Sequence, residues 1–147
     1  MQQISSLFES LRDHSRVWLY LANRRLSNDE VNYIFKELNQ FNARWSAHGK
    51  KLHSEISILF NHVIVFAVDE SIEFASGCSI DSSVREIKKL SVELKIDFFN
   101  RMHVMLWKDD KVELVPYSYI KKNKGLSYLN PLVSTLGELR ENWLIQS

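Results

Sequence analysis

The chain has 147 residues, of which 45% are hydrophobic, 25% charged and 12% aromatic; this composition excludes an intrinsically disordered protein and predicts one globular domain, residues 1–147. Nineteen Lys and Arg residues against eighteen Asp and Glu residues leave a formal net charge of +1, so no overall field attracts nucleic acid or an anionic membrane. A single cysteine excludes an intramolecular disulfide and a metal site built from paired cysteines.

The first residues predict a short amphipathic helix rather than a signal peptide, because no basic stretch precedes an apolar one. The helix is expected over residues 2–13, where the apolar residues at helical spacing are Ile4, Leu7, Phe8 and Leu11. The longest apolar run covers only residues 63–68, against the roughly 20 residues that a membrane helix needs. We therefore expect a cytoplasmic protein that does not span a membrane.

The next two elements are a strand and a long helix. Residues 16–21 alternate apolar side chains on one face with Trp18 and Tyr20 on the other, which predicts a central strand with both faces covered. Ser27 and Glu30 have the spacing of a capping box, so a helix is expected to begin here. Its apolar stripe consists of Val31, Ile34, Phe35, Leu38, Phe41 and Trp45, and Gly49 is expected to stop it.

A β-hairpin follows this helix. Residues 52–60 alternate apolar and polar side chains, which predicts a strand with one solvated face, at an edge of the sheet or in a partly exposed position. Asn61 and His62 are expected to form the turn, with Asn61 at positive φ. Residues 63–68 are apolar on both faces and rich in β-branched side chains, which predicts a central strand.

Residues 68–84 predict a loop that leads into a second long helix. That helix is expected to begin near Ser82 or Ser83, because Ser83 and Glu86 again have the spacing of a capping box. Its apolar stripe consists of Val84, Ile87, Leu90 and Leu94. The C-terminal part predicts a strand over 103–107, a turn at Asp109 and Asp110, a strand over 111–115, a short helix over 117–123, a surface crossing over 125–133 and a last helix capped by Thr135 and Glu138.

The order of these elements predicts an α+β fold. It contains the βαββαβ order of a ferredoxin-like core with an antiparallel sheet, with an extra C-terminal hairpin strand and flanking N- and C-terminal helices. That topology places its first and third strands in the middle of the sheet and its second strand at an edge. The covered faces of strands 16–21 and 63–68 and the polar face of strand 52–60 agree with this placement.

Cys78 has the most reactive side chain in the predicted loop. Near a helix start, free backbone amides and the helix dipole stabilise a thiolate, so Cys78 is a candidate nucleophile and Asp81 a candidate acid or base. The alternative is structural, because a free cysteine often behaves as a small buried residue, while Asp81 and the neighbouring serines are typical helix caps.

The same loop could bind an anion. Gly77 permits close backbone approach, and hydroxyls beside free amides suit phosphate or carboxylate. The candidate ligand-binding residues are Gly77, Cys78, Ser79, Ser82 and Ser83, with Arg16 and Arg101 as candidate cations opposite the loop. The structural alternative is again a well-capped helix.

Other chemistries have weaker support in the sequence. Asp69 and Glu70 could ligate a hard cation, but acidic residues are common at strand ends, so we expect no metal and no cofactor. Trp18 and Tyr20 lie near arginines, as in proteins that bind single-stranded nucleic acid, but no RNP-like pattern accompanies them. We therefore expect no nucleic-acid partner.

Several stretches resemble a family of small uncharacterised bacterial proteins, and the resemblance covers nearly the whole chain. The stretches are SRVWLY at 15–20, WSAHG at 45–49, AVDES at 67–71 with ASGCSIDSSVREI at 75–87, and DFFNRM at 97–102. Family members often carry the label "ABC transporter ATPase", but this chain has neither a GxxxxGK[ST] loop nor an LSGGQ-like signature, so we expect no ATP binding. The resemblance implies that residues 77–83 are the characteristic feature of the family.

Two classes of function follow from the sequence. The first is a non-catalytic binding or adaptor module that uses residues 76–83 at a helix N-terminus to hold a small anionic ligand or a protein partner. The second is a small enzyme acting on a phosphate- or carboxylate-bearing substrate, with Cys78 or Asp81 in the site and an arginine holding the anion.

Overall fold

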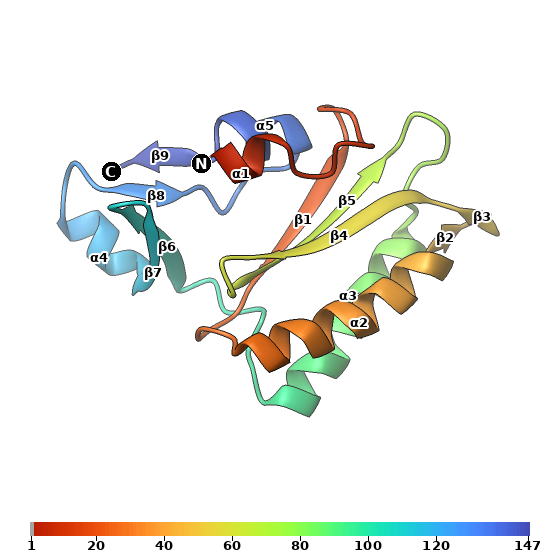
Figure 1. Ribbon diagram of the computed structural model, residues 1–147, viewed down its shortest axis with the longest axis horizontal. Coiled ribbons are helices and arrows are strands. Elements are labelled where there is room, and N and C mark those ends of the chain that lie inside the picture. Colours follow the sequence, from red (N-terminus) through yellow and green to blue (C-terminus); the bar gives the residue numbers. More distant parts are fainter. Residues whose placement is uncertain (1) are drawn as a thin grey trace.

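The computed structural model describes residues 2–147, which form an α+β fold with mostly antiparallel sheets (Figure 1). The first part of the chain contains α1 (Gln2–Ser5), β1 (Arg16–Leu21), α2 (Asn28–Arg44), β2 (Ser46–Ala47), β3 (Lys50–Lys51), β4 (His53–Leu59), β5 (Val63–Asp69) and α3 (Gly77–Leu94). The second part contains β6 (His103–Lys108), β7 (Lys111–Pro116), α4 (Tyr117–Lys122), β8 (Ser127–Leu129), α5 (Leu136–Glu141) and β9 (Leu144–Gln146). No helix in residues 2–147 is long and apolar enough to cross a membrane.

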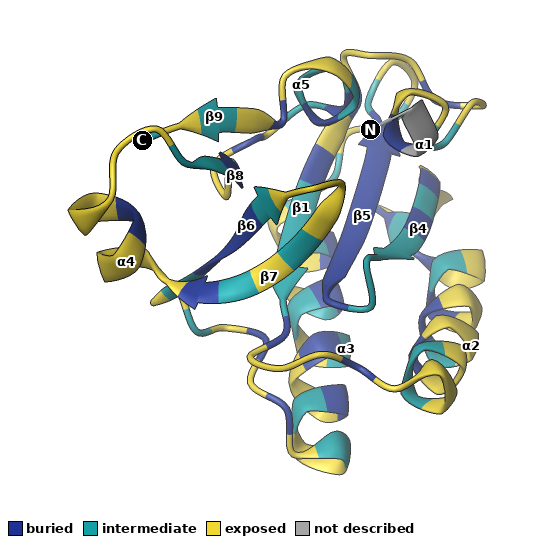
Figure 2. Ribbon diagram, turned by 60° about the vertical axis from the view of Figure 1, so that its left-hand side comes forward, coloured by how far each residue is buried: buried dark blue, intermediate teal, exposed yellow. Residues whose placement is uncertain are grey.

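The first sheet has the strand order β1-β5-β4 and is antiparallel throughout. β5 lies in the middle and is buried along its whole length, as Figure 2 shows. Its even-numbered side chains, Ile64, Phe66 and Val68, face a core that α2 and α3 close. Its odd-numbered side chains, which include Val65 and Ala67, face a second core that contains residues of α1 and α5. The predicted central position of strand 63–68 is therefore confirmed.

The second sheet has the strand order β7-β6-β8-β9. Its buried residues Val104, Leu106 and Tyr128 form a small third core with Ile120 of α4. Met105 of β6 and Leu129 of β8 join the core on the odd-numbered face of β5. The two sheets therefore share one layer of packing, while β7 stays largely exposed (Figure 2).

Several local predictions are confirmed. Ser27 and Glu30 form the capping box, with the Glu30 N–H donating to the Ser27 hydroxyl and the Ser27 N–H donating to the Glu30 carboxylate. Asn61 in the β4–β5 turn has φ of 55°, as predicted for this residue. Asp109 and Asp110 both have positive φ in the β6–β7 turn, which is the conformation that a two-residue hairpin turn requires.

The N-terminal helix is shorter than predicted. α1 ends at Ser5, and the following residues form turns up to β1. The guanidinium of Arg140 donates to the carbonyls of Leu7, Phe8 and Leu11. A helix would use those carbonyls for its own ladder, so the contacts with Arg140 satisfy a non-helical backbone instead.

The predicted ferredoxin-like sheet is not completed, and the prediction that β1 is a central strand is wrong. The order β1-β5-β4 matches the first three strands of that topology, but the fourth strand, β6, pairs with β7 and β8 instead of β1. The reason lies in residues 125–133, which were predicted as a surface crossing and instead contain β8. Because β8 occupies the second edge of β6, β1 remains an edge strand of the first sheet.

Candidate functional site

Residues 77–83 are the first two turns of α3, and the prediction of a loop before a helix start near Ser82 or Ser83 is wrong. Ser76 is the N-cap residue, and its hydroxyl accepts a hydrogen bond from the Ser79 N–H at 3.1 Å. Ser76 precedes Gly77 in an extended conformation, and N-caps of this kind satisfy the free amides of a first turn. The N-cap, Ser76, therefore lies seven residues before Ser83, the N-cap that the capping-box pattern indicates.

The serines of this segment act within the fold. The hydroxyls of Ser79, Ser82 and Ser83 each donate to a carbonyl three residues earlier. In the part of the chain that the structure describes, the hydroxyl that accepts from an amide of this first turn is that of Ser76, rather than a side chain of Ser79, Asp81, Ser82 or Ser83 as predicted. The Ser79 carbonyl also accepts from the Trp45 indole N–H at 2.8 Å, which fastens α3 to the core. This pattern supports the structural interpretation of the serines.

The other sequence candidates are dispersed over the surface. Cys78 and Asp81 are exposed on the first turns of α3. Arg16 begins β1, with its guanidinium carbon 4.7 Å from the centre of the Trp18 ring. Arg101 lies between α3 and β6. Across residues 2–147, the structure shows no hydrogen bond or ion pair from either arginine to residues 76–83. The anion site at residues 76–83 stays a prediction.

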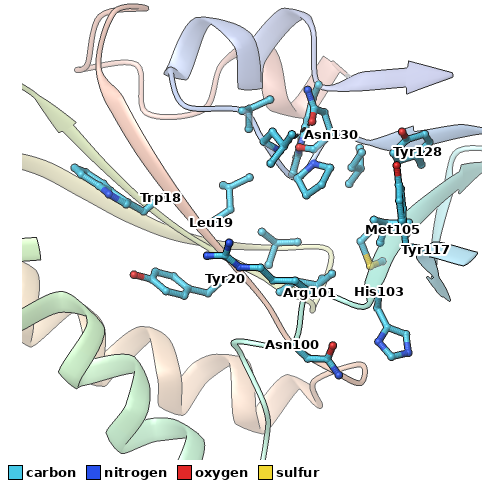
Figure 3. A pocket seen from close by; sticks show the side chains of 18 of the residues that line it. Trp18, Leu19, Tyr20, Asn100, Arg101, His103, Met105, Tyr117, Tyr128 and Asn130 are labelled. Carbon is cyan, nitrogen blue, oxygen red and sulfur yellow. Dashed lines mark hydrogen bonds between the residues drawn. The ribbon is translucent and has the colours of Figure 1, made fainter. Parts of the chain in front are cut away.

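A groove lies along the open edge of β1 and has a volume of about 640 Å³. We call it the β1 groove. Its walls are residues 17–21 of β1, residues 98–101 before β6, residues 103–105 of β6, and residues 128–133, which run from β8 toward α5. The remaining lining residues are Val63, Tyr117, Trp143 and Ile145. The groove occupies the place beside β1 where a completed sheet has its next strand (Figure 3).

The backbone of β1 contributes unpaired polar groups to the groove. The Val17 N–H donates to the Ser134 carbonyl, and the Asn23 N–H donates to the Asp97 carbonyl. The backbone N–H and C=O groups of the odd-numbered residues of β1 therefore point away from β5. Between these two contacts lie the carbonyl of Val17 and both backbone groups of Leu19 and Leu21. None of these five groups has a hydrogen-bond partner in the part of the chain that the structure describes.

Arg101 is the one residue with a permanent charge in the lining, and no aspartate or glutamate lines the groove. Within residues 2–147 it has no acidic partner. Figure 3 shows its side chain directed toward β1. The ring of Phe99, two residues earlier, lies 5.8 Å from the Tyr20 ring in an edge-to-face contact. This contact positions the segment that carries Arg101 against β1.

Tyr20 connects the groove with α3. Burial raises the pKa of its hydroxyl, and a hydrogen bond with Ser83 lowers that pKa by a smaller amount. Ser83, a predicted ligand-binding residue, therefore lies near Tyr20 but outside the lining of the groove, and its own hydroxyl donates to the Ile80 carbonyl. The hydroxyl of Tyr20 stays protonated at neutral pH, because its ordinary pKa is already 10.0.

Sequence reasoning identified one residue of this groove by its charge, Arg101, and two by their aromatic character, Trp18 and Tyr20. It missed the wall from β8 to α5, which includes Tyr128 and Leu129. The sequence signal that could have found this wall is the adjacent pair of large apolar residues Tyr128 and Leu129 in a segment predicted to cross the surface. Both residues are buried in the structure. Among residues 2–147, no three His, Cys, Asp or Glu side chains are placed to hold a metal ion together.

Comparisons with known proteins give no match: no family model, no curated protein and no solved structure is similar to this chain. The resemblance to a bacterial family therefore stays a prediction, and the function must be argued from the geometry.

Proposed function

We propose that the protein is a non-catalytic binding module, and that its ligand lies in the β1 groove with an anionic group beside Arg101. The observation that supports this most is the combination of a cavity of about 640 Å³, walls of apolar and aromatic side chains, and a single unpaired cation. Ligand sites in proteins have this character, with a mainly apolar lining and few polar groups that fix orientation. The proposal moves the site from residues 76–83 to the groove.

The lining favours binding over catalysis. The lining contains one residue that commonly serves as a general acid or base, His103. It contains no cysteine, aspartate, glutamate or lysine that would pair with His103 in a covalent or general acid–base mechanism. The enzyme alternative based on Cys78 and Asp81 places its chemistry on an exposed helix face outside the lining. The arginines near this part of α3, Arg44 and Arg85, line a small pocket with Ser82 and Glu86, and neither Cys78 nor Asp81 lines that pocket.

The proposal is tested with 8-anilinonaphthalene-1-sulfonate, a probe with an apolar aromatic body and one anionic group. We expect one probe molecule to bind per chain, and R101Q to weaken the binding about tenfold through loss of a charge-assisted contact. The measurement is a fluorescence titration of the folded protein, with folding verified by circular dichroism in the near ultraviolet.

K88Q is the matched control, because Lys88 is an exposed cation on α3 outside the groove. It should leave the affinity for the probe unchanged. Equal binding to wild type, R101Q and K88Q, or no binding at all, contradicts the proposed function.

A further inference from the structure

We infer that the natural occupant of the β1 groove is an extended segment of a partner protein, which adds a strand to the open edge of β1. The inference rests on the proposed function and specifies its ligand. Three observations support it: the unpaired backbone groups of β1, the extended contacts that close both ends of the open edge, and the charge of the lining.

The first observation is the row of unpaired backbone groups. The carbonyl of Val17 and the N–H and carbonyl of Leu19 and Leu21 face an apolar groove. Backbone N–H and C=O groups are strong donors and acceptors, so an unpaired row of them along a strand edge can pair with the backbone of another strand. From Val17 to Leu21 the strand rises about 13 Å, and an extended backbone supplies donors and acceptors at the matching spacing, as a compact small molecule does not.

The second observation is that the chain itself already pairs with the two ends of this edge. Arg16 forms an antiparallel bridge with Thr135, and the Val17 N–H donates to the Ser134 carbonyl. At the other end the Asn23 N–H donates to the Asp97 carbonyl. The open part is therefore a window of about four residues between two natural pairing partners. A short strand fits this window and continues the pairing.

The third observation is the charge of the lining, which specifies the side chains of the occupant. In an added strand, successive side chains alternate between the two faces of the sheet. One face carries Tyr20, with Phe99 and then Arg101 beside it, and an acidic side chain is favoured there. The other face meets Met105 and Leu129, which belong to an apolar core. We therefore infer an occupant with an acidic residue between apolar residues.

The experiment is a selection from a random octapeptide display library against the folded protein, followed by synthesis of the enriched peptides. We expect the enriched peptides to carry an acidic residue with an apolar residue directly before it and another directly after it. When such a peptide binds, amide hydrogen exchange of Leu19 and Leu21 should slow at least tenfold, while that of Trp18 and Tyr20, which face β5, should change little. N-methylation of every second peptide amide should abolish binding when the methylated amides are those that pair with β1. It should leave binding intact when the methylated amides are the intervening ones.

Two variants separate the outcomes. L19P removes one edge N–H that does not pair with β5, and proline is tolerated on an edge strand when its nitrogen faces outward; it should lose peptide binding. The methylated peptides test the same hydrogen bonds without changing the groove that binds the probe. R101Q should weaken the binding of both the peptide and the probe. Strand addition is wrong if probe binding depends on Arg101 but no peptide is enriched. It is also wrong if bound peptides leave the Leu19 and Leu21 amides unprotected. In both cases the groove remains a ligand site. If the probe binding is independent of Arg101, the proposed function itself is wrong.

Discussion

Trp45 shows how one side chain holds both long helices on the first sheet. It follows directly after α2, is 2% exposed, and its ring contacts the rings of Trp18, Phe41 and Phe66. Its indole N–H donates to the Ser79 carbonyl in the first turn of α3. A buried aromatic ring with a satisfied polar group contributes both apolar burial and a specific contact, so Trp45 fixes where α3 begins relative to β1.

We predict that W45A lowers the free energy of unfolding by about 3–5 kcal/mol, because it leaves a large cavity and removes the indole donor. Phe35, which the sequence pattern placed in the same apolar stripe, is 44% exposed. F35A should therefore cost about 1 kcal/mol or less. Equilibrium urea unfolding measures both, and similar costs for the two variants would show that Trp45 is not in the core.

The start of α3 gives a second prediction at this scale. S76A should destabilise the protein by about 1 kcal/mol, because the Ser76 hydroxyl caps the Ser79 N–H. S82A should cost much less, since its hydroxyl donates back to a carbonyl of the same helix. Thermal unfolding of both variants decides the position of the cap. A larger loss of stability in S82A than in S76A would indicate that the helix begins near Ser82, as the sequence predicted.

Among the elements, α2 has the best-defined start. The Arg24 guanidinium donates to both carboxylate oxygens of Glu30, at 2.8 and 2.7 Å, and the Ser27 N–H donates to the same carboxylate. These contacts, with Arg24 as the larger cause, lower the pKa of Glu30 to about 2. The carboxylate is thus bound in its charged form at the positive end of the helix, where the dipole also favours it.

We predict a corresponding pH dependence. Because the pKa of Glu30 is lower in the folded state than its ordinary value of 4.5, unfolding takes up a proton at acidic pH. The stability that Glu30 contributes is therefore complete above about pH 4.5 and is lost as the pH falls toward about 2. In R24Q the pKa of Glu30, followed by NMR titration of its side chain, should rise toward the ordinary value.

The neighbouring Arg25 provides the control for this titration. It is exposed and makes no ion pair with Glu30, so R25Q should leave the pKa of Glu30 unchanged. An equal shift in both variants would attribute the low pKa to the general charge of the surface rather than to the bidentate contact.

The elements also show what a hydrophobic pattern can predict. Residues 63–68 and 16–21 are both apolar on both faces, and both strands do have both faces packed against cores. Face coverage says nothing about the edges of a strand, however, because edge pairing uses backbone groups that every residue carries. The pattern therefore predicted β5 correctly and placed β1 wrongly in the centre of the sheet. β8 has only three residues, too few for a period to be recognised.

At the scale of the whole molecule, the groove results from the way the second half of the chain folds. β6 pairs with β7 and β8 rather than with β1. The two strands are therefore separated, and the groove occupies the space between them (Figures 1 and 3). The walls come from residues 17–21, 98–101, 103–105 and 128–133, from three stretches that are far apart in the sequence. The candidate site could not be predicted from local motifs, because no single stretch contains it. Arg101 was predicted as a ligand-binding residue, but opposite residues 76–83 rather than in a groove beside β1.

The central claim is that β1 has an open edge in the free protein, and amide hydrogen exchange of the unliganded chain measures this most directly. The amides of Trp18 and Tyr20, which face β5, should exchange slowly, whereas those of Leu19 and Leu21, which face the groove, should exchange at least tenfold faster under the same conditions. Equal protection of all four amides would contradict the account, because it would mean that another strand of the same chain already covers β1.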